Sequence, residues 1–86
     1  MHYYVYLLKC GDGTLYTGWT NDIDARLTAH REGRGAKYTR GRGPLELVYT
    51  EELATKSEAA KREYHIKKMT RKQKKALIDK KGCQQQ

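Results

Sequence analysis

The first twenty residues alternate between apolar runs and a glycine-rich turn, a pattern typical of a β-hairpin. Residues 3–9 are almost all aromatic, β-branched or aliphatic, which predicts a strand covered on both faces. Gly11-Asp12-Gly13 predicts a turn, because glycine accepts the positive φ that tight hairpins require. Residues 14–20 then predict the returning strand.

A helix, a basic loop and a third strand are expected next. Asn21-Asp22 supplies cap-type residues, and residues at helical spacing follow, so a helix should begin there and end near Gly33. Residues 33–43 are glycine-punctuated and basic, which predicts a loop. Pro44 then precedes a strand over 45–50, in which every second residue, beginning with the first, is expected to share one face.

Two capping-box patterns predict the last two helices. Thr55 is followed three residues later by Glu58, so a helix should begin there and run to about residue 69. Thr70 and Gln73 repeat the pattern and predict a third helix that ends near residue 82.

These elements predict an α+β fold in the order ββαβαα, with helices packed on a small three-stranded antiparallel sheet. We expect strand order 2-1-3, because a later strand pairs most simply with the open side of the first strand. Residues 1–82 are expected to form a single domain and residues 83–86 a disordered tail.

The net charge of the chain indicates which class of molecule it could bind. Lys and Arg number 18 against 10 Asp and Glu, which gives a net charge of +8. Such a balance suits a polyanion, and nucleic acid is the commonest one. A merely soluble basic protein has the same composition, so charge alone leaves both interpretations open.

Cysteine usage and hydropathy favour a cytoplasmic protein without a membrane partner. Cys10 and Cys83 are too few for a disulfide framework and show no metal-ligand spacing. No apolar run approaches the roughly 20 residues that span a bilayer. A signal-peptide pattern is not found at residues 1–4, which lead directly into the first strand.

The hairpin brings polar aromatic residues to one face of the sheet. If its turn is centred on Asp12, Tyr6 lies opposite Gly18 and Leu8 lies opposite Tyr16. Tyr6, Tyr16 and Gly18 then share a face, and the glycine leaves space beside the Tyr6 ring. A two-residue turn would shift this register, and tyrosines that merely fill a strand are the alternative interpretation.

The first two expected helices add ionisable groups. Arg26 and His30 are four residues apart and face the sheet, either as a functional pair or as a surface pair that shields the rim of the core. Glu63 lies near the middle of the apolar arc of its helix, where a carboxylate is costly unless it is paired or binds metal. Lys67 shares that arc, so a structural salt bridge is the alternative to a metal site.

Together these residues resemble a GIY-YIG nuclease domain of the small stand-alone bacterial type. The resemblance spans about residues 3–75 and extends to the Slx-type structure-specific endonucleases. Tyr4 stands where the family has glycine, and the only asparagine, Asn21, does not lie beyond Glu63, where many members carry one. The matching segments are Tyr4-Val5-Tyr6, Tyr16-Thr17-Gly18, Arg26 with His30, Lys37-Tyr38-Thr39, Gly41-Arg42-Gly43-Pro44 and residues 57–63.

The resemblance implies a metal-dependent endonuclease that hydrolyses phosphodiester bonds in DNA. Tyr6 would help to deprotonate the attacking water, with Tyr16 and His30 supplying hydrogen bonds and relaying the proton. Arg26 would neutralise charge on the phosphate oxygens. Glu63 would hold one Mg²⁺ or Mn²⁺, with water and substrate completing the coordination shell. The alternative is a non-catalytic nucleic-acid-binding protein that retains the fold.

Basic residues around the expected site predict phosphate contacts. The ten Lys and Arg residues between positions 61 and 81 are either a solvated helix face or a surface that follows a nucleic-acid backbone. No base-reading module is found, so selectivity for flaps or branches is expected rather than a recognition sequence. We expect a monomer that acts in DNA repair or processing, with a possible protein partner supplying specificity. The expected nucleic-acid-binding residues are Arg34, Lys37, Tyr38, Arg40, Arg42, Lys67 and Lys68.

Overall fold

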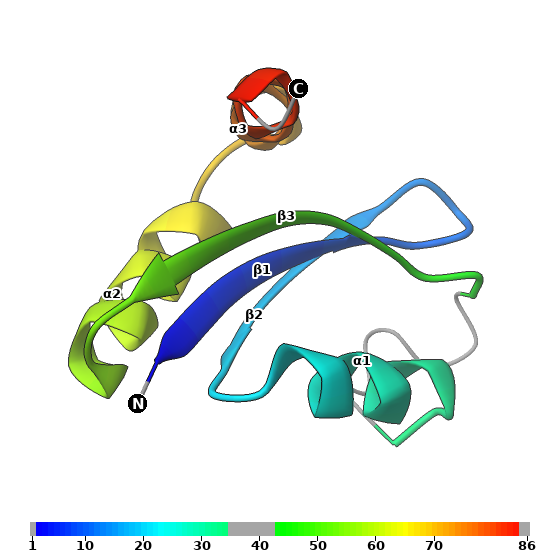
Figure 1. Cartoon of the computed structure of the whole chain (residues 1–86). Helices are drawn as coiled ribbons and strands as arrows, with labels where there is room; N and C mark the ends of the chain where they lie inside the picture. The colour runs from blue at the N-terminus through cyan, green and yellow to red at the C-terminus, as the bar shows by residue number, and fades with distance from the viewer. Residues whose placement is uncertain (1, 35–42, 85–86) are drawn as a thin grey trace.

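A computed structural model describes residues 2–34 and 43–84 and shows three strands and three helices (Figure 1). The α+β class and the order ββαβαα are confirmed. The elements are β1 (Tyr3–Lys9), β2 (Leu15–Thr20), α1 (Ile23–Arg31), β3 (Glu46–Leu53), α2 (Lys56–Lys67) and α3 (Arg71–Gln84).

The sheet is antiparallel with strand order β2-β1-β3, as the sequence predicts, so β2 is an edge strand. In the hairpin, Tyr6 lies opposite Gly18 and Leu8 lies opposite Tyr16, which confirms the register expected from a turn centred on residue 12. The turn depends on Gly13, whose φ is 88°. This left-handed conformation is inexpensive only for glycine.

Strand β3 corrects the expected alternation. Leu7 pairs with Tyr49 and Leu8 pairs with Leu47, so Val48 is an extra residue in a β-bulge. Because the bulge changes the phase of the strand, Tyr49 joins the core with Leu7, whereas Leu47 follows the face of Leu8. The strand also extends three residues beyond the expected end, since its last residues pair with the start of β1.

Each helix begins at the expected cap. The Asp22 side chain accepts a hydrogen bond from the backbone N–H of Ala25 at 3.1 Å. The Thr55 hydroxyl accepts from the N–H of Glu58 at 3.1 Å. The third cap has the reciprocal capping-box bonds, in which the Thr70 hydroxyl accepts from the N–H of residue 73 and the Thr70 N–H donates to that residue's side-chain oxygen.

The helix ends differ from expectation. Helix α2 ends at Lys67, two residues early, because the N–H groups of Lys68 and Met69 bond to carbonyls three residues back and close the last turn. Helix α3 continues to Gln84, so the start of the expected tail is helical. Glycine at position 82 does not end it, since an interior glycine weakens a helix by only about 1 kcal/mol. The last two residues lie outside the described chain.

The two faces of the sheet bury different partners. Val5 and Leu7 pack against Ala59 and Ile66 of α2 in the main core, which α3 extends. The opposite face of β1 contributes Tyr6, which contacts His30 of α1. Figure 1 shows α1 on one side of the sheet and α3 on the other. None of the described helices is both long and apolar enough to cross a bilayer.

Candidate active site

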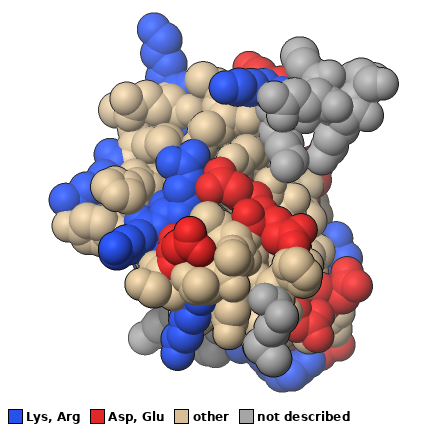
Figure 2. Space-filling view, turned by 60° about the vertical axis from the view of Figure 1, so that its left-hand side comes forward, with Lys and Arg blue, Asp and Glu red and all other residues tan. Residues whose placement is uncertain are grey.

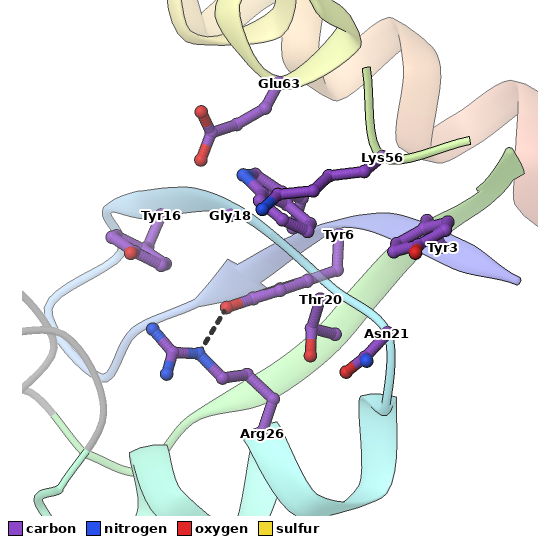
Figure 3. A pocket seen from close by; sticks show the side chains of 10 residues that line it. Tyr3, Tyr6, Tyr16, Gly18, Thr20, Asn21, Arg26, Lys56 and Glu63 are labelled. Carbon is purple, nitrogen blue, oxygen red and sulfur yellow. Dashed lines mark hydrogen bonds between the residues drawn. The ribbon is translucent and has the colours of Figure 1, made fainter. Parts of the chain in front are cut away.

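The largest concentration of the expected site residues lies in a pocket of about 530 Å³ at the edge of the sheet (Figure 3). Tyr6 of β1, Tyr16 of β2, Arg26 of α1 and Glu63 of α2 all line it. Four elements that are separate in the sequence therefore supply one concave surface. His30 does not line the pocket but lies behind the Tyr6 ring.

The pocket crosses the edge strand β2 and draws residues from both faces of the sheet. Gly18 pairs with Tyr6 and lies on the face covered by α1, whereas Trp19 pairs with Val5 and lies on the face covered by α2. Both Gly18 and Trp19 line the pocket. The carboxylate of Glu63 points into the pocket from the α2 side, while Arg26 reaches it from the α1 side (Figure 3). Because β2 is the edge strand of the sheet, side chains from helices on opposite faces can reach the same pocket.

Tyr6 is held by two polar neighbours from α1. Its hydroxyl lies 2.9 Å from His30 Nε2, and it accepts a hydrogen bond from Arg26 Nε at 3.4 Å. Tyr6 is 1% exposed and His30 is 2% exposed. The one-turn spacing of Arg26 and His30 places both side chains beside the same hydroxyl.

Gly18 is required by the position of the Tyr6 ring. A Cβ atom on Gly18 would lie 2.5 Å from Tyr6 Oη and 3.1 Å from Tyr16 Cε2. Carbon and oxygen cannot approach so closely without displacing the ring. The space that the glycine leaves is therefore filled by the phenol, and the Tyr6 and Tyr16 rings meet at a centroid separation of 6.4 Å.

Burial determines the protonation states of Tyr6 and His30. Desolvation raises the pKa of Tyr6 above its ordinary value, although the hydrogen bond from Arg26 opposes the shift. Desolvation, followed by the charge of Arg26, lowers the pKa of His30, so the imidazole is neutral at pH 7. The hydrogen bond to Tyr6 raises the pKa of Arg26, which stays cationic. The resting site thus holds a neutral phenol, a neutral imidazole and a guanidinium.

Glu63 lies in the pocket and also has the salt-bridge partner expected from the sequence. It lines the pocket, and its Oε2 lies 3.8 Å from Lys67 Nζ. The Glu63 side chain is 21% exposed and that of Lys67 is 54% exposed, so the pair is solvent-screened and weak. The carboxylate is thus available to a cation that approaches from the pocket.

The donor set fits a hydrated divalent ion. The described residues contain no group of three or more His, Cys, Asp or Glu side chains that could hold a metal. A site with one carboxylate suits Mg²⁺ or Mn²⁺, because such ions keep several waters and bind substrate phosphate oxygens. Glu63 could hold one ion of this kind, whereas a structural zinc site would need four protein ligands.

Several expected nucleic-acid contacts lie away from the pocket. Arg34 pairs with Glu32 at 3.0 Å through Nε. Lys68 Nζ lies 4.4 Å from the centroid of the exposed Tyr64 ring. The remaining residues expected to contact nucleic acid in the basic loop lie outside the described chain; they are Lys37, Tyr38, Arg40 and Arg42.

The pocket also contains residues that the sequence did not single out. Lys56 lines it, and its Nζ lies 5.8 Å from the centroid of the Trp19 ring. Trp19 directly follows the glycine of the tripeptide motif, and Lys56 directly follows the cap of α2, so their positions beside known motifs were the available signals. The other additional lining residues are Tyr3, Thr20 and Asn21.

A comparison with known proteins identifies the family of this chain. A family model described as the GIY-YIG catalytic domain matches residues 2–76. The chain belongs to the GIY-YIG family. Membership confirms the resemblance seen in the sequence and places the protein in a nuclease family, for which DNA is the expected substrate.

Relatives of similar length support the assignment. A UPF0213 protein of Clostridium perfringens is 58% identical over 83 residues, which cover 96% of this chain and 89% of the relative. The solution NMR structure of a UPF0213 protein from Bacillus halodurans has 50% identity and a TM-score of 0.63, covering 95% of this chain and 87% of that chain. A solution NMR structure from E. faecalis has 42% identity and a TM-score of 0.66, covering 96% and 88%. None of these names states an activity.

Proposed function

We propose that this GIY-YIG protein is a divalent-metal-dependent endonuclease that hydrolyses phosphodiester bonds in DNA. One observation carries the proposal: a phenol, a guanidinium and a carboxylate from opposite faces of the sheet line the same open pocket. Tyr6, Arg26 and Glu63 are these groups. Binding of nucleic acid alone would not require a carboxylate in a cationic pocket, since it repels phosphate.

Tyr6 accepts a proton from the attacking water while it passes its own hydroxyl proton to His30. A phenol with a raised pKa is a poor base alone, because it is almost fully protonated at neutral pH. The neutral imidazole, 2.9 Å away, can accept the Tyr6 hydroxyl proton at Nε2. As that proton moves to His30, the Tyr6 oxygen takes a proton from the attacking water. Tyr16 packs against both rings and orients them.

Arg26 and Glu63 handle the charge of the phosphate. Arg26 reaches the pocket beside the Tyr6 hydroxyl, where its guanidinium can neutralise the non-bridging oxygens as charge develops. Glu63 points into the pocket from the α2 side and would hold the cation. A bound Mg²⁺ or Mn²⁺ would supply Lewis-acid polarisation of the phosphate and charge stabilisation for the leaving oxygen.

Uneven surface charge supports nucleic acid as the substrate. On the face in Figure 2, Lys and Arg side chains gather along one side, while Asp and Glu lie mainly in the middle and on the other side. Phosphate contacts of this kind give affinity without sequence readout. We therefore propose selectivity for DNA shape, such as flaps or branches, in repair or processing. Monomeric state, cytoplasmic location and a specificity-supplying protein partner remain predictions.

The test is cleavage of matched single-stranded, duplex, flap and branched DNA, and of RNA, with and without Mg²⁺ or Mn²⁺. Glu63→Gln should abolish metal-dependent cleavage while preserving the fold and DNA binding. Glu52→Gln is the control, because Glu52 is an exposed acid on β3 outside the pocket. Equal cleavage by wild type and Glu63→Gln would refute the proposal. Salt-sensitive binding by wild type without cleavage under any condition would favour the non-catalytic alternative.

A further inference from the structure

A second, smaller groove lies beside the β1–β2 hairpin. It has a volume of about 190 Å³ and is lined by Thr14, Leu15, Arg71 and Lys74. None of these four residues lines the catalytic pocket. Its two charged members are both cations, so the groove is suited to an anion.

Lys74 has an unusual environment for a lysine. Among the lysines whose side chains are described, it is the only one that is half-buried rather than exposed. Burial and the neighbouring charge of Lys67 lower its pKa. Within the described part of the chain, no carboxylate forms an ion pair with it. A half-buried ammonium without an acidic partner is costly, and a bound anion would offset that cost.

The neighbouring cations connect this groove to the catalytic pocket. Arg71 Nη2 lies 3.7 Å from the position that a Cβ atom would take on Gly13, which places the guanidinium over the hairpin turn. On the other side, Lys67 is close enough to Lys74 to lower its pKa. Lys67 in turn pairs with Glu63 of the pocket at 3.8 Å. A row of three cations therefore leads from the pocket to the hairpin.

We propose that the Thr14–Leu15–Arg71–Lys74 groove binds a backbone phosphate of the same nucleic-acid strand whose scissile phosphate occupies the catalytic pocket. The inference rests on the proposed function for the source of the strand. Lys67 lies between the two sites and contacts the intervening backbone. The groove is a binding site and takes no part in the bond cleavage.

The position of the groove favours a polynucleotide over a single small anion. Leu15 of the groove directly precedes Tyr16 of the catalytic pocket on β2, so the two sites lie along the same strand. A nucleic-acid strand can contact both sites through separate phosphates, whereas inorganic phosphate can occupy only one of them at a time.

The experiment measures binding of a labelled single-stranded oligonucleotide to the full chain without divalent metal, at several salt concentrations. Lys74→Met and Arg71→Met should each weaken binding roughly fivefold at low salt and reduce the salt slope by about 0.7, the value for one lost contact on a single strand. Lys74→Arg should retain near wild-type affinity. Lys80→Met is the matched control, since Lys80 is exposed on α3 and lines neither site.

Chemical shifts of backbone amides, measured by NMR, show whether the oligonucleotide binds in the groove. The oligonucleotide should shift Thr14 and Leu15 in wild type and shift them less in Lys74→Met. Wild-type affinity and salt slope in folded Lys74→Met and Arg71→Met would overturn the proposal, as would an equally strong response to inorganic phosphate alone. The assay contains no metal and no cleavage step, so a negative result would reject the phosphate groove without bearing on Glu63-dependent cleavage. Conversely, if the protein does not cleave DNA, a loss of binding in Lys74→Met would still support the groove.

Discussion

The Tyr6 hydroxyl and His30 Nε2 lie 2.9 Å apart, so the phenol that faces the pocket is joined to a buried imidazole behind it. Burial raises the pKa of Tyr6 and lowers that of His30. Both groups are therefore neutral at pH 7, and Nε2 of the neutral imidazole can accept the phenol proton as the phenol oxygen takes a proton from water.

Removal of the Tyr6 hydroxyl is expected to remove this route. Tyr6→Phe keeps the ring over Gly18 and should fold, but its cleavage rate should fall by roughly 10²–10⁴-fold, the usual contribution of a positioned acid or base. The rate is measured with labelled DNA in Mg²⁺. Tyr64→Phe is the control, because Tyr64 is 57% exposed on α2. Wild-type rates in Tyr6→Phe would exclude the phenol as proton acceptor.

Arg26 should resist replacement by lysine. Lysine keeps the charge but cannot reproduce the Nε contact to Tyr6 or the planar fork that binds two phosphate oxygens. Arg26→Lys should therefore lower kcat by about 10²-fold with a smaller change in KM. Arg31→Lys, at an exposed position on the same helix, should behave as wild type. A change confined to KM would show that Arg26 only binds substrate.

His30 should make the protein sensitive to mild acid. Its folded-state pKa is lowered, so as pH falls below about 6.5, the unfolded value, the unfolded chain binds a proton that the folded chain excludes. Stability should then decrease with falling pH, with a slope of at most about 1.4 kcal/mol per pH unit for one proton. Urea unfolding across this range measures the slope. His30→Gln should flatten it, and His65→Gln, at an exposed position on α2, is the matched control.

Gly18→Ala should damage both stability and activity. The added Cβ would lie 2.5 Å from Tyr6 Oη, so the ring must move away from its hydrogen-bonding partners. Overpacking of this kind costs about 1–3 kcal/mol, which thermal unfolding would detect. Gly43→Ala is the matched control, since no described atom lies within 4 Å of its added Cβ. Equal unfolding temperatures for the two variants would contradict the close approach of Tyr6.

Local chemistry explains which parts of the fold were predictable. The hairpin register follows from a short turn at Gly13, and all three helix starts follow from cap residues that bond within their own first turn. The bulge at Val48 could not be predicted, because an extra residue in a strand is visible only against its partner. The same limit applies to the end of β3, which depends on pairing with Tyr3.

The residues of the candidate site also fall into those that the sequence predicted and those that it did not. Tyr6, Arg26 and Glu63 were recognisable as polar groups at positions that point inward from their own elements. Lys56 and Trp19 were not, because an exposed lysine beside a cap and an aromatic residue in a strand are ordinary features of any small sheet. Their meeting in the pocket becomes visible only in three dimensions.

By itself, the sequence determined the elements, the cationic character and the polar residue types, since these depend on neighbours within one turn or one hairpin. Only the tertiary structure decided that Arg26 and Glu63, from helices on opposite faces, meet around the edge strand β2. The physical reason is packing. The face that each helix covers is set by contacts between residues far apart in the chain, such as Ile66 with Val5 and His30 with Tyr6.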